Sequence, residues 1–228
     1  MVGPISSLQL WYPCQYVLHI ELIRPAQNGG FSDVFEDLGA IFNSAINDEK
    51  VRVVILSGVC DTTLQVGVEA TALARDAGGV QKCVFALEAC IKPVICITQG
   101  VCSASGTALA CACDVRISTS NTIFTLKGAE ASGVNAVAML AKEVCSFSWL
   151  RDVSLTRRGF QANEAYRMGF ASRICGSKTE AFNEALRLAL MIADRSIYAV
   201  QTAKMACVRE LQPNGKAPMS YLALAHSD

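Results

Sequence analysis

The chain has almost no histidine, and its cysteines lack the spacing that metal sites use. His19 and His226 are the only histidines among 228 residues, and no two of the 11 cysteines are three positions apart. Structural zinc sites are built from closely spaced Cys and His ligands, so this pattern argues against a metal site. An odd number of cysteines in a chain of this length also argues against a disulfide scaffold. Most cysteines are expected to be small buried hydrophobes in a reducing compartment.

The chain also lacks an excess of either charge and any long apolar run. It has 20 basic and 20 acidic side chains, so nothing favours nucleic acid or an anionic membrane as a partner. No apolar segment is long enough to span a bilayer. The first residues lack the order of a secretory signal, and the last three are not a peroxisomal address. We therefore expect a soluble, intracellular protein, without choosing between cytoplasm, mitochondrion and peroxisome.

Apolar side chains are what the chain has in abundance. Hydrophobic residues make up 52% of it, and the mean hydropathy is +0.33. This composition is typical of a globular domain with a large core and not of a disordered chain. The length is sufficient to bury most of that apolar surface without help from disulfides or metals.

Short apolar runs in the first half of the chain predict strands. Residues 51–57 (VRVVILS) and 94–98 (VICIT) are nearly continuous apolar runs of strand length. Such runs are typical of parallel strands that are buried on both faces. Further strands are predicted at 16–23, 114–118 and 123–126.

Helical spacing of apolar residues accounts for most of the remaining chain. Ser32 can cap a helix that continues to Ala45, and the small residues of 103–112 predict a tightly packed helix. Strands and helices alternate at first and helices then dominate, which predicts an α/β fold with a right-handed βαβ core and a helical C-terminal region. The other predicted helices cover 81–90, 134–144, 146–155, 163–168, 180–192 and 196–211.

Three separated segments carry motifs in the same order as in one known family. Residues 17–25 read VLHIELIRP, residues 92–95 and 114–117 read KPVI and DVRI on either side of the small-residue helix, and ANEA at 162–165 precedes GFASRI at 169–174. Together they resemble the enoyl-CoA hydratase/isomerase (crotonase) family, and the first segment is most similar to its dienoyl-CoA isomerase branch. The resemblance implies a crotonase-like ββα spiral core over 1–195. It also implies a truncated C-terminal helical trimerisation region over 196–228.

The resemblance implies that the protein binds an acyl-CoA thioester and uses no other cofactor and no metal. Family members hold the thioester oxygen with two backbone N–H groups, an oxyanion hole that stabilises an enolate-like transition state. By position, these donors are the amides of Val68 and Ser105, and the second lies at a helix start, where peptide dipoles favour negative charge. The family usually has glycine at Ala104 and Ser105, so the added side chains can narrow the site. The positions that match the CoA and substrate contacts are Val66, Gly67, Glu69 and Gly106.

The side chains for acid–base chemistry are missing from their usual positions. The two glutamates of the hydratases match Ala108 and Gly128, and the second aspartate of the dienoyl-CoA isomerases falls near Asn135 or Ala136. None of these side chains can transfer a proton. Because a general base contributes roughly 10²–10⁴-fold in rate, ordinary hydration is expected to be lost.

Glu130 is the remaining candidate for the catalytic acid or base. It lies two positions beyond the empty second position, between two glycines, so a local shift can bring it into the pocket. The alternative is that Glu130 is a solvated loop acid. Glu69 is expected to order its loop and not to transfer protons. The cysteines of 102–113 have no nearby histidine to lower a thiol pKa, so a cysteine nucleophile is not expected.

Two hypotheses remain open at this point. The first is an enzyme of the enoyl-CoA hydratase/isomerase type, dienoyl-CoA isomerase-like, that acts on a CoA thioester through the oxyanion hole. The second is a catalytically inactive member that binds acyl-CoA or serves as an oligomer subunit, which Ala108 and Gly128 favour. In either case the resemblance and the apolar helix at 181–192 predict a homotrimer or hexamer.

Overall fold

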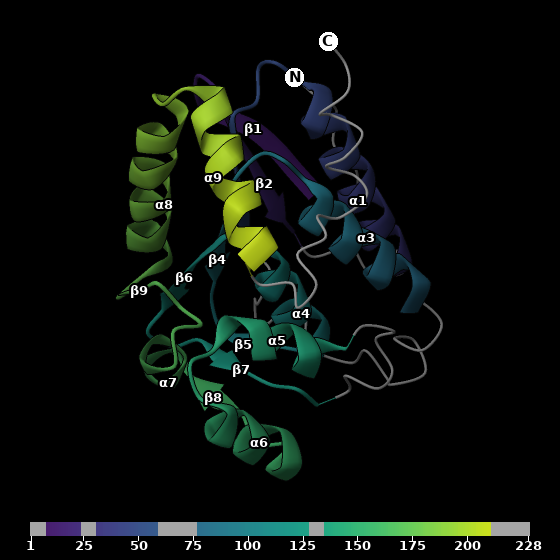
Figure 1. Cartoon of the computed structure of the whole chain (residues 1–228), viewed down its shortest axis with the longest axis vertical. Helices are drawn as coiled ribbons and strands as arrows, with labels where there is room; N and C mark the ends of the chain where they lie inside the picture. Colours follow the sequence, from purple (N-terminus) through teal and green to yellow (C-terminus); the bar gives the residue numbers. More distant parts are fainter. Residues whose placement is uncertain (1–7, 24–30, 59–76, 128–134, 211–228) are drawn as a thin grey trace.

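A six-stranded sheet forms the centre of the computed structural model, which describes residues 8–23, 31–58, 77–127 and 135–210. Its strands are β1 (Leu8–Cys14), β2 (Val17–Leu22), β3 (Val53–Ser57), β4 (Val94–Thr98), β6 (Val115–Thr119) and β9 (Arg173–Cys175). The order across the sheet is β1-β2-β3-β4-β6-β9 (Figure 1). β1 runs antiparallel to β2, and the other neighbours pair in parallel. The parallel α/β arrangement expected from the apolar runs is therefore confirmed.

Alternate residues of each central strand face two different layers of helices. On β3, Val54 and Leu56 join the core cluster that contains helices α1 (Phe31–Asn47) and α3 (Ala77–Ala89). Val53 and Ile55 join a second cluster formed with helix α8 (Lys178–Ala193). Successive side chains of a strand point to opposite faces, so a strand covered on both sides is apolar throughout. This explains the continuous apolar run at 51–57.

Helix α8 packs closely against the sheet because one side of it is lined with alanine. Its buried residues are Ala181, Ala185, Ala189 and Ala193, which are four positions apart and share one face. The last helix, α9 (Ile197–Glu210), lies in front of the sheet beside α8 (Figure 1). Lys204 ties α9 to the core: its Nζ donates to Asp114 Oδ2 at 2.6 Å and to the carbonyl of Lys92 at 3.0 Å. The proposed division at residue 195 stays a prediction.

A small second sheet and four shorter helices complete the described chain. The sheet has the order β5-β7-β8, with β5 (Val101–Cys102), β7 (Ile123–Phe124) and β8 (Phe160–Gln161). Phe124 and Phe160 stack at 5.2 Å and pack with Phe170 in its core. The helices are α4 (Ala104–Ala112), α5 (Ala136–Glu143), α6 (Phe147–Thr156) and α7 (Ala162–Arg167). No helix in the described ranges is long and apolar enough to cross a bilayer.

Five elements differ from the sequence prediction. Strands β1, β5, β8 and β9 were not predicted, and β1 extends the sheet by an antiparallel edge that tolerates Pro13. Helix α3 begins at Ala77, before the predicted start at Gln81, and includes Gly78 and Gly79. The other predicted strands and helices that fall on described residues are present, with ends shifted by one or two residues.

His19 is a buried histidine that joins the sheet to the helix layer. It is 3% exposed, its Nε2 lies 2.8 Å from Ser57 Oγ, and its ring contacts those of Trp11 and Phe182. Its Nδ1 has no hydrogen-bond partner among the described residues. Burial lowers the pKa of His19 from 6.5 to about 4. The neutral ring is therefore the form that the fold accommodates.

The fold should lose stability as the pH falls from neutral toward the pKa of buried His19. The unfolded chain takes up a proton at this position below pH 6.5, whereas the folded chain resists it down to about pH 4. The free energy of unfolding is therefore highest above the unfolded pKa of 6.5. It falls on acidification, by about 2 kcal/mol between pH 7 and pH 5. Urea unfolding at both pH values should show this loss in the wild type. A His19→Gln variant should lack it, and equal losses in the two proteins would contradict the assignment.

Candidate active site

The start of helix α4 is organised by Ser103. Its side-chain Oγ accepts a hydrogen bond from the Gly106 N–H at 3.3 Å, and its carbonyl accepts one from the Thr107 N–H at 2.7 Å. Serine is favoured at this capping position because it satisfies donors that the helix itself cannot. The two earlier amides of the first turn, those of Ala104 and Ser105, have no acceptor in the described part of the chain.

These two amides are suited to holding a negatively charged or polarised oxygen. They lie at the positive end of the helix dipole, and Ser105 is only 3% exposed, so water screens little of the interaction. An oxyanion hole needs such prearranged donors where charge develops. The amide of Ser105, the predicted second donor, therefore has the burial and the helix dipole that an oxyanion-hole donor needs. The amide of Gly106, predicted to contact substrate, is engaged by the Ser103 cap.

The short second sheet fixes where α4 begins. Gly100 has a φ of 71°, a left-handed conformation that lets the chain turn from β4 into β5. The carbonyl of Gly100 accepts from Ile123 N–H at 2.8 Å, and that of Cys102 accepts from Thr125 N–H at 3.0 Å. Thr107 Oγ1 then donates to the carbonyl of Thr125 at 3.2 Å. Hydrogen bonds made before and after the capping residue Ser103 thus fix the first turn of α4 beside β7.

Arg116 anchors the other end of α4. Its guanidinium donates to the carbonyls of Ala110 (3.1 Å), Cys113 (2.6 Å) and Phe170 (2.5 Å), and it pairs with Glu143 Oε2 at 2.5 Å. Cations are favourable beside the unpaired carbonyls at a helix C-terminus. No role for Arg116 was predicted, although a charged residue in a buried strand indicates one. Two of its partners, Phe170 and Glu143, are too far away in sequence to be inferred.

The described residues that the resemblance matches to acid–base positions carry no proton-transfer group. Ala108 is completely buried within α4. Asn135 caps helix α5, with its Oδ1 accepting from the Ala138 N–H at 2.9 Å, and the neighbouring Ala136 is buried. Asn135 is therefore occupied in holding the helix start. That these three positions correspond to the family's acid–base residues stays a prediction.

Several predicted site residues lie outside the described residues. The first donor, Val68, and its neighbours Val66, Gly67 and Glu69 fall within 59–76. Glu130 and the empty position Gly128 fall within 128–134. Their roles stay predictions, so the described site consists of the start of α4 and the groups that hold it.

The buried cysteines at the end of α4 do not have the properties of nucleophiles. Burial raises the pKa of the Cys111 and Cys113 thiols, the opposite of what a nucleophile needs. Cys102 is disulfide-bonded, whereas nine other cysteines in the described ranges are free. No cluster of three metal-ligating side chains occurs among the described residues.

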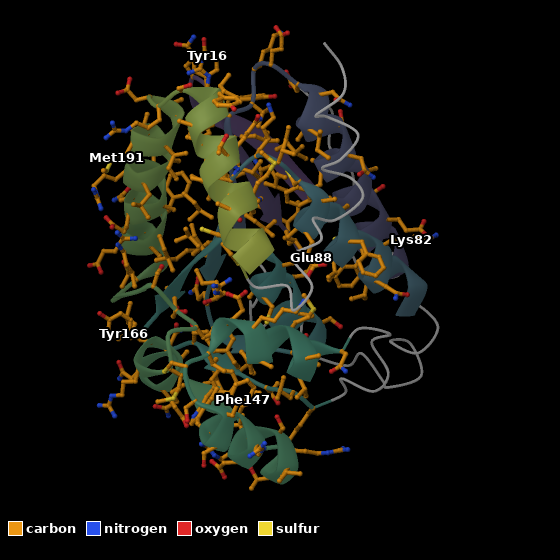
Figure 2. The ribbon with its side chains drawn as sticks, in the orientation of Figure 1. Tyr16, Lys82, Glu88, Phe147, Tyr166 and Met191 are labelled. Carbon is orange, nitrogen blue, oxygen red and sulfur yellow. The ribbon has the colours of Figure 1, made fainter. Side chains whose placement is uncertain are left out.

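A cavity of about 650 Å³ lies at the opposite end of α4 from this site. Its lining includes Cys113 and Asp114 from the end of that helix and Lys204 from α9. Figure 2 shows two more of its lining residues, Glu88 and Met191, on either side of α9 in that view. Because none of the first-turn residues lines it, this cavity is separate from the candidate oxyanion site.

Comparison with known proteins places most of the chain in one group. The family described as enoyl-CoA hydratase/isomerase matches residues 14–224. A mitochondrial Delta(3,5)-Delta(2,4)-dienoyl-CoA isomerase of Rattus norvegicus is 27% identical over 241 residues, covering 96% of this chain and 73% of the relative. A carnitinyl-CoA dehydratase of Proteus mirabilis is 30% identical over 201 residues, covering 82% and 75%.

Solved structures have the same fold. A monofunctional enoyl CoA isomerase from M. smegmatis superposes with a TM-score of 0.74 at 24% identity, covering 92% of this chain and 97% of that one. At this identity the likeness concerns the fold.

Proposed function

Because this chain belongs to the enoyl-CoA hydratase/isomerase family, we propose that it binds acyl-CoA thioesters and acts on them through an oxyanion hole. The amides of Val68 and Ser105 are the proposed donors. The observation that carries the proposal is the start of α4, where the amides of Ala104 and Ser105 are buried and free of acceptors in the described chain. Backbone donors do not depend on the side chain, so the replacement of glycine by Ser105 leaves this donor in place.

The reaction we propose is of the dienoyl-CoA isomerase type. Relatives that carry this name match the chain over nearly its whole length. Moving double bonds from positions 3 and 5 to positions 2 and 4 removes a proton from C2 and returns one to C6. Loss of the C2 proton shifts negative charge onto the thioester oxygen. Donors at the start of α4 stabilise that charge, and they need no hydratase carboxylate to do so.

Glu130 is the proposed base for the C2 proton. Ala108 and Asn135 cannot fill that role, the first because it has no titratable group and the second because its oxygen caps α5. Val66, Gly67, Glu69 and Gly106 remain the proposed CoA and substrate contacts. A general base must come within hydrogen-bond reach of the proton that it removes, so this assignment requires Glu130 to approach the start of α4.

A 3,5-dienoyl-CoA thioester should be converted slowly to its 2,4-isomer, and Glu130→Gln should reduce the rate by roughly 10²-fold or more. The product differs from the substrate because its diene is conjugated with the thioester carbonyl, and it can be followed by its ultraviolet absorbance. Glu69→Gln is the matched control, because Glu69 is assigned to loop order. No turnover by the wild type would favour the alternative, a catalytically inactive member that binds acyl-CoA. Equal effects of the two variants would remove Glu130 from the mechanism.

We also propose that the protein forms homotrimers or hexamers. Leu190 and Met191 on α8 and Tyr198 on α9 are large apolar side chains that are about half or more exposed. Exposed apolar side chains that gather on neighbouring helices are typical of contact surfaces. A single monomeric species in sedimentation at micromolar concentration would contradict this assembly.

A further inference from the structure

The hydroxyl group of Ser105 is buried without a hydrogen-bond partner. The residue is 3% exposed, and its Oγ finds neither donor nor acceptor in the described part of the chain. Its neighbours differ, because Ser103 Oγ caps Gly106 and Thr107 Oγ1 donates to Thr125. Ser105 is the second residue of α4, so its hydroxyl has no carbonyl of a preceding helical turn to which it can donate. A buried unpaired hydroxyl is costly, so its presence requires an explanation.

The position of this hydroxyl points to a ligand. Oγ is two bonds from the Cα atom that carries the proposed oxyanion-hole amide, so the side-chain donor and the main-chain donor lie at the same helix start. The adjacent amide of Ala104 is likewise without an acceptor among the described residues. A negatively charged oxygen atom is the kind of acceptor that these unpaired donors lack.

We propose that the Ser105 hydroxyl is an additional donor to the thioester oxygen and strengthens the oxyanion hole beyond its backbone amides. The inference rests on the proposed function, since it assigns a side chain to the same site. Glycine, the usual residue of the family at this position, has no such donor. The hydroxyl therefore favours ligands whose thioester oxygen becomes anionic, that is, acyl-CoA thioesters that form an enolate. The hydroxyl contributes nothing to the binding of CoA derivatives that lack this oxygen.

The test is a titration of bound 3-oxobutanoyl-CoA, whose enolate absorbs in the ultraviolet. Ser105→Ala should raise the pKa of the bound ligand by about one unit or more, which is a tenfold or greater loss of enolate at a fixed pH. Ser105→Gly should behave in the same way. Ser154→Ala is the matched control, because Ser154 Oγ on α6 is also buried without a partner in the described ranges. That variant should leave the titration unchanged.

Two further measurements separate the proposed role from a structural one. The S-butyl thioether of CoA lacks the carbonyl oxygen, so Ser105→Ala should change its Kd by less than about twofold. The same variant without ligand should melt no lower than the wild type, because it removes an unpaired hydroxyl. An unchanged titration, or equal weakening of thioester and thioether, would overturn the role of Ser105. Failure of the wild type to bind either compound would instead overturn the proposed function, and this inference with it.

Discussion

Hydration of crotonyl-CoA by this protein should be at least a hundredfold slower than by an ordinary enzyme, at or below about 0.1 s⁻¹ against a median near 10 s⁻¹. Hydration needs one group to activate water and another to protonate the product. The positions matched to these groups by sequence resemblance hold Ala108, which is buried and apolar, and Gly128. Each general acid or base contributes roughly 10²–10⁴-fold, so the loss of both removes most of the rate.

The measurement is the decrease in absorbance of crotonyl-CoA as its double bond is hydrated. The dienoyl-CoA assay on the same preparation is the control for correct folding. Turnover of crotonyl-CoA within tenfold of 10 s⁻¹ would show that another side chain supplies the acid–base chemistry.

Replacing Arg116 by alanine should destabilise the protein by about 3–5 kcal/mol. The variant would leave Glu143 without its cation and three carbonyls, those of Ala110, Cys113 and Phe170, without their donor. Arg116 is 7% exposed, so water cannot easily replace these bonds. Arg116→Lys should recover only part of the loss, because an ammonium group cannot reproduce the planar fork of the guanidinium. Chemical unfolding measures both variants.

Arg173→Ala is the matched control for this prediction. Arg173 lies on the neighbouring strand β9 and pairs with Glu184, but its side chain is 38% exposed. Exposed ion pairs contribute at most about 1 kcal/mol, so this variant should be close to the wild type. A loss for Arg116→Ala no greater than that for Arg173→Ala would contradict the anchoring role.

The sheet could largely be predicted from the sequence because its strands are buried on both faces. The apolar runs that include Val53–Ser57 and Val94–Thr98 have this burial, and the two strands pair in parallel as expected. Strand β1 could not be predicted, because its turn into β2 has no glycine or asparagine. Tyr16 adopts a φ of 67° there, with Arg52 stacked on its ring at 3.9 Å and the Arg52 N–H donating to its carbonyl. Contacts 36 positions away in sequence thus stabilise a turn that local rules do not predict.

The candidate site, like the sheet, could be predicted only in part from the sequence. The position of Ser105 at the start of a small-residue helix followed from the motif, and the absence of carboxylates at Ala108 and Asn135 followed from residue identity alone. The unpaired state of the Ser105 hydroxyl and the four partners of Arg116 depend on which groups the fold brings together. Asn135 as the cap of α5 is a local feature that the sequence could have indicated, since asparagine is a preferred capping residue.

Binding of a CoA thioester tests the central claim most directly. Binding to the folded state alone stabilises a protein by about 2.7 kcal/mol at a hundredfold excess of ligand over its Kd. For a chain of this length that corresponds to a rise in Tm of about 5–10 °C. Melting scans with millimolar acetyl-CoA should show this rise, whereas scans with free pantetheine should show little, because pantetheine lacks both the nucleotide and the thioester oxygen. An unchanged Tm with acetyl-CoA would contradict the assignment of this protein as a CoA-thioester protein.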